Sequence, residues 1–203
     1  MASGKVITGY SFPFVALYNN NNGVISYTDG QELARGVNVN ISLETGDVEN
    51  FYANNVAAES AGGAFTGGEA TLTVDGLKAD ARKLIMGLPT ADSISVGGTS
   101  VDVYDYDDRQ QIPYVGIGFV VRYMEDGVTS YRPVMLPKAI FNQDGLEANT
   151  QEESIDFQTT ELTANILRDD STYHKWRRIA EDQTTEDAAV NVVKTLLGIA
   201  LSI

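Results

Sequence analysis

The chain has 203 residues, and 14 lysine and arginine residues stand against 28 aspartate and glutamate residues, for a formal net charge of −14. It contains no cysteine and a single histidine, His174, which excludes disulfides, thiolate metal sites, cysteine nucleophiles and multi-histidine metal sites. So acidic a protein is not expected to bind a nucleic-acid backbone by bulk electrostatics. No apolar run reaches the ~18 residues of a membrane span and no secretion signal is evident, so we expect a soluble, β-rich protein assembled in the cytosol, without membrane binding.

Alternation of apolar and polar residues with period two predicts strands through the first two thirds of the chain. The pattern is clear over 37–43, 70–74 and 115–123. The turn Glu125-Asp126-Gly127 and the run 128–136 predict a hairpin, in which Pro133 indicates an edge strand or a bulge. Further strands are predicted around 138–142 and 154–167.

Helical spacing of apolar residues predicts a helix over about 76–86, with Asp75 as its cap and Gly87 followed by Pro89 as its end. A second helix is predicted over about 185–197, where Glu186 and Asp187 follow a threonine cap. A short helix is also expected over 171–180.

Long segments poor in core residues interrupt these elements. Residues 44–68 are rich in Gly, Ala, Asn and Glu and are expected to form a loop or arm with a weak hairpin around Phe51. Residues 90–112 are rich in Gly, Ser and Asp and are predicted to be a second loop or arm. With no internal repeat or linker evident, the pattern favours one α+β domain, mainly β, spanning 1–203.

Two short motifs have the composition of a binding site. The acidic run 102–108 could hold calcium, but it lacks the glycine and the distal glutamate of an EF-hand loop, so a solvated loop is favoured. The glycine-rich stretch 62–68 precedes a strand instead of a helix and is followed by no Lys-Ser/Thr pair, which argues against a phosphate cradle.

The basic run 174–178 (His-Lys-Trp-Arg-Arg), together with Arg168, is the one cluster of positive charge. We interpret it as a complement to an acidic surface on this subunit or a neighbour. No catalytic arrangement is found, so no enzymatic activity and no cofactor are expected. Residues 1–77 carry eight acidic and two basic residues, and 144–161 carry six acidic residues and no basic one. The hypothesis that follows is that one face is kept acidic so that a polyanion passes without sticking.

Several long stretches resemble the major tail proteins (tail tube proteins) of long-tailed, non-contractile phages. They are MASGKVITGYSFPFVALY, QELARGVNVNI, NFYANNVAAESAGGAFTGGEATLTVDGL, YVGIGFVVRYMEDGVTSYRPVMLPKAIF, TQEESIDFQTTELTANILRDDSTYHKWRR and DQTTEDAAVNVVKTLLG. The resemblance covers nearly the whole chain except 90–112.

The resemblance implies a β-sandwich or open barrel with a flanking helix, which assembles into hexameric rings that stack into a tube. The tube surrounds the tape measure protein, later conducts double-stranded DNA without sequence-specific binding, and meets the tail terminator and distal tail or baseplate proteins at its ends. Such a subunit is assembled in the bacterial cytoplasm and resides in the virion. The rival hypothesis is a calcium- or carbohydrate-binding β-sandwich module centred on 102–108.

In a tube, the polar strand faces are expected to line the lumen, because a ring-wide barrel turns one sheet face inward. The lumen candidates are Asn38, Asn40, Ser42, Glu69, Thr71, Thr73, Asp156, Gln158, Glu161 and Thr163. Candidates for contacts between subunits or rings are Phe51, Tyr52, Phe65, Arg168, Lys175, Trp176, Arg177, Arg178, Leu201 and Ile203. The apolar C-terminal tail 199–203 is expected to dock on its own sheet or on a neighbour.

Overall fold

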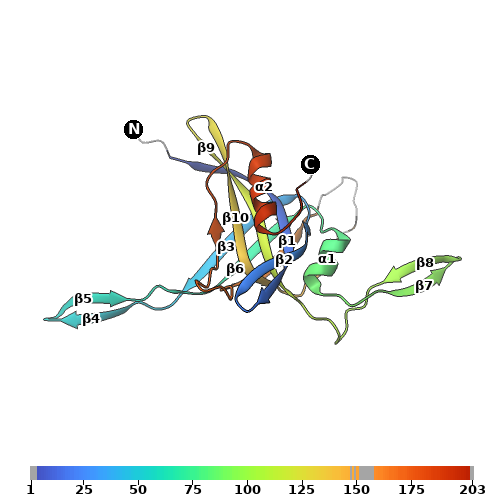
Figure 1. The fold of residues 1–203 in the computed structure, drawn as a ribbon, viewed down its shortest axis with the longest axis horizontal. Helices are drawn as coiled ribbons and strands as arrows, with labels where there is room; N and C mark the ends of the chain where they lie inside the picture. The colour runs from blue at the N-terminus through green and yellow to red at the C-terminus, as the bar shows by residue number, and fades with distance from the viewer. Residues whose placement is uncertain (1–3, 147, 149, 151–157, 202–203) are drawn as a thin grey trace.

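A computed structural model describes residues 4–146, 148, 150 and 158–201 (Figure 1). The fold is α+β and mainly β, as the sequence predicts. The elements in chain order are β1 (Val6–Asn21), β2 (Val24–Glu32), β3 (Gly36–Thr45), β4 (Glu49–Ala53), β5 (Val56–Ala61), β6 (Phe65–Val74), α1 (Ala79–Met86), β7 (Asp92–Val96), β8 (Thr99–Val103), β9 (Tyr114–Glu125), β10 (Val128–Phe141), β11 (Thr160–Leu167), β12 (Arg178–Ile179) and α2 (Glu186–Leu196).

The main sheet is antiparallel and has the spatial order β2-β1-β9-β10-β11-β6-β3, with β12 paired to β10 beside β11. The long strands β9 and β10 form the central hairpin that the Asp-Gly turn predicts. The sheet curves so that its two halves, β1–β9–β10 and β11–β6–β3, turn their apolar faces toward each other. β2 and β3 are left at the two ends of the sheet order.

The main core fills the inside of this curved sheet. Apolar residues of β9 such as Ile117 and Phe119 lie there with Leu72 of β6 and Leu162 of β11, and helix α1 closes one end with Ile85. All five side chains are at most 2% exposed. Period-two alternation is what allows each strand to place one apolar face in this core while its other face points outward.

Helix α2 covers the outer face of the β1–β9–β10 half. Its residues Val193 and Leu197 lie over Gly116 and Gly118 of β9, where an added Cβ atom would approach their side chains to within 3.0 Å. A second apolar cluster forms in this interface, with Phe14 of β1 and Met135 of β10 as further members. The helix thus packs directly on the backbone of β9 at Gly116 and Gly118, two outward positions that carry no side chain.

The helices predicted over about 76–86 and about 185–197 are both present, but the first begins later than predicted. In α2, Thr185 is the N-cap, and its Oγ1 accepts a hydrogen bond from the backbone N–H of Ala188 at 3.3 Å. Helix α1 begins at Ala79, not near 76, and Asp75 does not cap it. The Asp75 carboxylate instead pairs with the Arg35 guanidinium and accepts from the Arg35 backbone N–H, so it is occupied by a residue far away in the chain.

The predicted helix over 171–180 is wrong. The carboxylate of Asp169, only 4% exposed, accepts hydrogen bonds from the backbone N–H groups of Ser171 and Lys175, at 3.2 and 2.7 Å. These bonds hold the segment in a turn, after which Arg178 and Ile179 join the sheet as β12.

The strands predicted over 138–142 and 154–167 also differ from the structure. Strand β10 continues without interruption to Phe141, and β11 begins at Thr160, while 154–157 lie outside the described residues. Pro133 lies within β10, and its carbonyl accepts a hydrogen bond from Ala180 N–H on the side away from β9. The absence of a backbone N–H at Pro133 therefore costs no hydrogen bond between β9 and β10.

Candidate functional site

The outer face of the β11–β6–β3 half is polar and carries most of the predicted lumen residues. Strand register aligns them in cross-strand rows: Asn38–Thr73–Glu161, Asn40–Thr71–Thr163 and Ser42–Glu69–Asn165. Every one is exposed or partly exposed. We call this nine-residue surface the polar face.

Asn165 belongs to the polar face but is absent from the sequence-derived set. Its Nδ2 donates to Oδ1 of Asn142 at 2.9 Å, which extends the polar surface toward β10. The alternation of Glu161, Thr163 and Asn165 is the signal that could have identified it. Of the remaining candidates, Gln158 lies just before β11 and is exposed, and Asp156 lies outside the described residues.

The polar face carries negative charge at Glu69 and Glu161 and contains no lysine or arginine. On the neighbouring part of the sheet, Lys138 of β10 is paired with Asp170 at 2.8 Å, and its side chain is 13% exposed. The hydrogen bond from Lys138 is the main reason that the pKa of Asp170 lies below its ordinary value. This cation is therefore neutralised within the chain.

Two β-hairpins project from the end of the sheet opposite the β9–β10 turn, in different directions (Figure 1). The β4–β5 hairpin continues the β3–β6 pair through a hydrogen bond from Gly46 N–H to Ala64 O. All residues of β4 and β5 are exposed, including Phe51 at 65% and Tyr52 at 63%. Asn54 and Asn55 at the tip have positive φ, as a tight two-residue hairpin turn requires.

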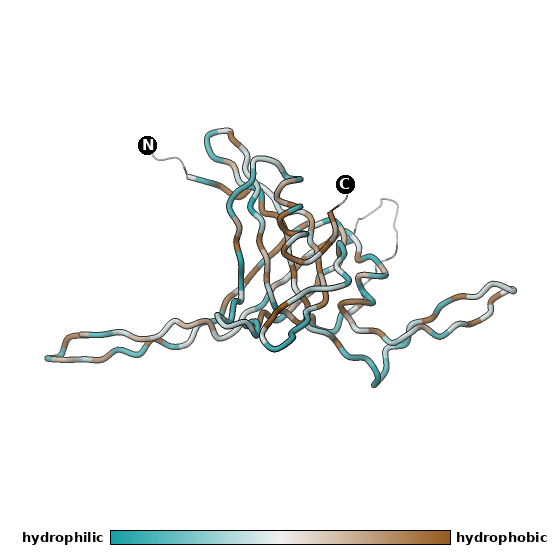
Figure 2. Tube along the Cα trace, in the orientation of Figure 1, coloured by the Kyte–Doolittle hydropathy of each residue, from teal (hydrophilic) through white to brown (hydrophobic). Residues whose placement is uncertain are grey.

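Within 90–112, which the sequence predicts to be a loop or arm, the structure has the β7–β8 hairpin. Residues 92–103 pair in full register around Gly97-Gly98, which both have positive φ. The signal was present, because Gly-Gly between two alternating runs is typical of a hairpin turn. Ile94, Val96 and Val101 are exposed along this hairpin, and Figure 2 shows that hydrophobic residues alternate with polar ones along both projections.

Phe65 and Trp176 stack on each other within the chain. Their ring centroids are 4.8 Å apart with an interplanar angle of 5°, and the guanidinium of Arg168 lies 5.9 Å from both rings. Arg168 also donates a hydrogen bond to the carbonyl of Phe65. Because Phe65 is 5% exposed and belongs to the main core, it is not available to a neighbouring subunit, which corrects its placement among the contact candidates.

The other predicted contact residues are at the surface where the structure describes them. Lys175, Arg177 and Arg178 are exposed, and Trp176 is partly exposed. At the C-terminal end, Ile199 packs against the cluster beneath α2, whereas Leu201 is 46% exposed. Ile203 lies outside the described residues.

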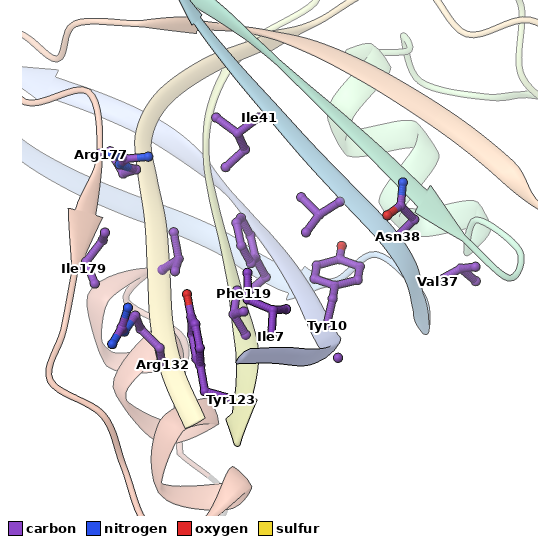
Figure 3. A pocket seen from close by; sticks show the side chains of 14 residues that line it. Ile7, Tyr10, Val37, Asn38, Ile41, Phe119, Tyr123, Arg132, Arg177 and Ile179 are labelled. Atoms are coloured by element: carbon purple, nitrogen blue, oxygen red, sulfur yellow. The ribbon is translucent and has the colours of Figure 1, made fainter. Parts of the chain in front are cut away.

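A groove of about 420 Å³ opens from the main core at the end of the sheet where β1 and β3 begin (Figure 3). Its lining residues are Ile7, Gly9, Tyr10, Val37, Asn38, Val39, Ile41, Phe119, Val121, Tyr123, Arg132, Val134, Arg177 and Ile179. The Tyr10 hydroxyl is buried and has no hydrogen-bond partner among the described residues, and burial raises the pKa of Tyr10. We call this feature the β1–β3 groove.

The acidic run 102–108 does not assemble a metal site in the structure. Asp107 binds the guanidinium of Arg109, with Nε–Oδ2 at 2.9 Å, which holds the pKa of Asp107 below its ordinary value. Throughout the part of the chain that the structure describes, no three acidic or histidine side chains are grouped so that they could hold a metal ion.

Neither a protein-family model nor a curated protein matches this chain. Among the described residues, neither α1 nor α2 is long and apolar enough to cross a membrane.

Proposed function

We propose that this chain is a structural subunit of a phage tail tube, which assembles into stacked hexameric rings around a lumen that conducts double-stranded DNA. The observation that carries the proposal is the polar face. It is continuous across β3, β6 and β11, none of its nine residues is positively charged, and each is exposed or partly exposed among the described residues. Six-fold symmetry and stacking come from the resemblance to major tail proteins.

The polar face has the chemistry that a DNA conduit requires. DNA carries one negative charge per about 1.7 Å of its axis, and lysine or arginine on the wall would bind phosphates by releasing counterions. A wall of asparagine, serine and threonine with Glu69 and Glu161 offers no such contacts and repels the duplex toward the axis. We propose that this face lines the lumen, which the tape measure protein would fill before DNA enters.

The ends of the sheet support assembly into rings. β2 and β3 each have one side that pairs with no strand among the described residues, and unpaired strand edges promote pairing with another chain. Pairing between neighbouring subunits would close a ring-wide barrel and remove both edges. The projecting hairpins would then reach adjacent subunits or rings, and the tail terminator and distal tail proteins would meet the last ring at either end.

Electron microscopy of the purified chain over a range of concentrations tests the proposal. We expect rings or hollow tubes with a regular repeat. Solid fibres or irregular aggregates without a lumen would contradict it. A monomer that melts at a higher temperature when calcium is added would contradict it and favour the binding module centred on 102–108.

A charge reversal tests the assignment of the lumen. Glu69→Lys combined with Glu161→Lys should leave tube assembly intact, because both side chains are exposed, but should slow DNA passage during genome ejection, most strongly at low salt. The matched control is Asp105→Lys with Asp108→Lys, which changes the net charge equally beyond the polar face. Equal ejection rates in the two double variants would show that the polar face does not line the channel.

A further inference from the structure

The β1–β3 groove is an apolar site that the described residues leave open. Ile7, Val37 and Ile179 at its rim are 66%, 54% and 54% exposed, whereas Tyr10 and Phe119 at its floor meet edge to face at 5.5 Å. Apolar side chains exposed together in a concave site are typical of a surface that another protein segment covers.

A charged group at the rim of the groove indicates what kind of segment fits. The Tyr10 ring lines the groove, whereas its hydroxyl oxygen is buried beneath the surface and out of reach of an incoming segment (Figure 3). Arg177 at the rim is exposed and forms no ion pair within the described part of the chain. The groove therefore favours an apolar segment that carries negative charge.

The β4–β5 hairpin has that composition. Phe51, Tyr52 and Val56 are each more than 60% exposed, a high value for side chains of this size. The segment 44–68 contains Glu44, Asp47, Glu49 and Glu59 and no lysine or arginine. The hairpin is thus complementary to the groove in both hydrophobicity and charge.

The β4–β5 hairpin and the β1–β3 groove lie at opposite ends of β3. Asn38 lines the groove, and the hairpin begins after Thr45, about 23 Å away at 3.3 Å per residue. The hairpin extends roughly 30 Å further from the sheet, since nine residues separate Thr45 from Asn54 at its tip. It points away from the groove of its own chain (Figure 1), so only a second copy can bring the two together.

We propose that the β4–β5 hairpin of one copy docks in the β1–β3 groove of the next copy. Aromatic side chains at positions 51 and 52 cover the apolar rim, and the acidic residues of the hairpin approach Arg177. The contact is head to tail, so a row of copies keeps a free hairpin at one end and a free groove at the other, and further copies can be added at both ends. This inference deepens the proposed function by assigning one of the contacts between subunits.

The absence of cysteine from the chain makes crosslinking a direct test. An Ala57→Cys protein, altered at the exposed position that pairs with Tyr52 and keeping both aromatic residues, is mixed with an Ile179→Cys protein of different tag length, and a short bismaleimide is added. Docking raises the local concentration of the two thiols, so we expect roughly tenfold more mixed dimer than in the control pairs. The controls are Ile94→Cys on the β7–β8 hairpin with Ile179→Cys, and Ala57→Cys with Tyr173→Cys, which lies outside the groove; Ile94 and Tyr173 are also exposed.

A charge exchange tests the same contact without crosslinking. Arg177→Glu should weaken self-association about threefold, because one rim charge pair is replaced by repulsion. Adding Glu49→Arg to that chain should restore the association, because hairpin and groove then carry exchanged charges. Glu59→Arg is tested in the same Arg177→Glu background. If neither Glu49→Arg nor Glu59→Arg restores the self-association, docking in this orientation is contradicted.

The outcomes separate this contact from the tube itself. Hollow tubes without crosslinks above the controls would overturn the docking contact and leave the proposed function in place. Crosslinked chains of copies without a lumen would support the contact and overturn the tube. Crosslinks equal to those of the control pairs, with or without tubes, would overturn the contact.

Discussion

The two halves of the main sheet have the same inner face and opposite outer faces. On β1–β9–β10, the outer positions include Gly116, Gly118 and Met135, and α2 covers them with an apolar cluster. On β11–β6–β3, the outer positions are polar, and among the described residues they are exposed or partly exposed. One outer face therefore stabilises the fold, whereas the other is free to serve a function at the surface. If this is correct, substitutions should have large effects on stability under α2 and small effects on the polar face.

The largest effect is expected from Leu197→Ala. Leu197 is completely buried against Gly116 and Gly118, and removing its side chain leaves a cavity beneath the end of α2. We expect a loss of about 3 kcal/mol in the free energy of unfolding, measured by urea denaturation. Thr195→Ala, at an exposed position of the same helix, is the control. Equal losses of unfolding free energy in the two variants would mean that the packing of Leu197 on β9 contributes little to stability.

Gly118→Ala should also destabilise the covered half, by overpacking. The added Cβ atom would lie 2.6 Å from Cγ1 of Val193, so the helix must shift, at a cost of about 2 kcal/mol. In a Val193→Ala background the same glycine substitution should cost less, because the obstructing methyl group is gone. Urea denaturation of the four proteins measures this coupling, and additive effects would contradict the close approach.

Asp182→Asn should have a smaller, pH-dependent effect. Hydrogen bonds from Arg132, at 2.6 Å, and from Lys5 hold the segment that leads into α2 and lower the pKa of Asp182 from 3.8 to about 2, with Arg132 the main cause. Because the folded-state value is the lower one, the stabilisation is complete above pH 4 and is lost as the pH falls through 2.

For this partly solvated pair we expect a loss of about 1 kcal/mol at pH 7 in Asp182→Asn, shrinking toward zero near pH 2. Urea denaturation at a series of pH values measures the difference from the unsubstituted chain. A difference that stays constant from pH 7 to pH 2 would show that the charge of Asp182 is not what stabilises this segment.

The smallest effect is expected on the polar face. Thr71→Val keeps the shape of the side chain at the centre of that face, where Thr71 is only partly buried. We expect the free energy of unfolding to change by less than about 0.5 kcal/mol. A loss above roughly 1.5 kcal/mol would show that the hydroxyl makes a needed contact, and the contrast between the two halves would then fail.

Period-two alternation was sufficient to predict which side of β3, β6 and β11 is buried, because strand geometry alone fixes that choice. For the same reason, eight of the ten lumen candidates could be placed together on one outer face. The cap of α2 was also predictable, because Thr185 binds an N–H group only three residues away. These features depend on neighbours in the chain.

Tertiary structure decided the rest, because it depends on partners far apart in the sequence. Asp75 resembles a helix cap but is held by Arg35, forty positions earlier. Phe65 lies in a glycine-rich stretch that suggests exposure, yet Trp176 stacks on it. The glycines of β9 gave no indication that α2 would lie over them. Local patterns determine which way each side chain points, whereas long-range packing determines what, if anything, covers it.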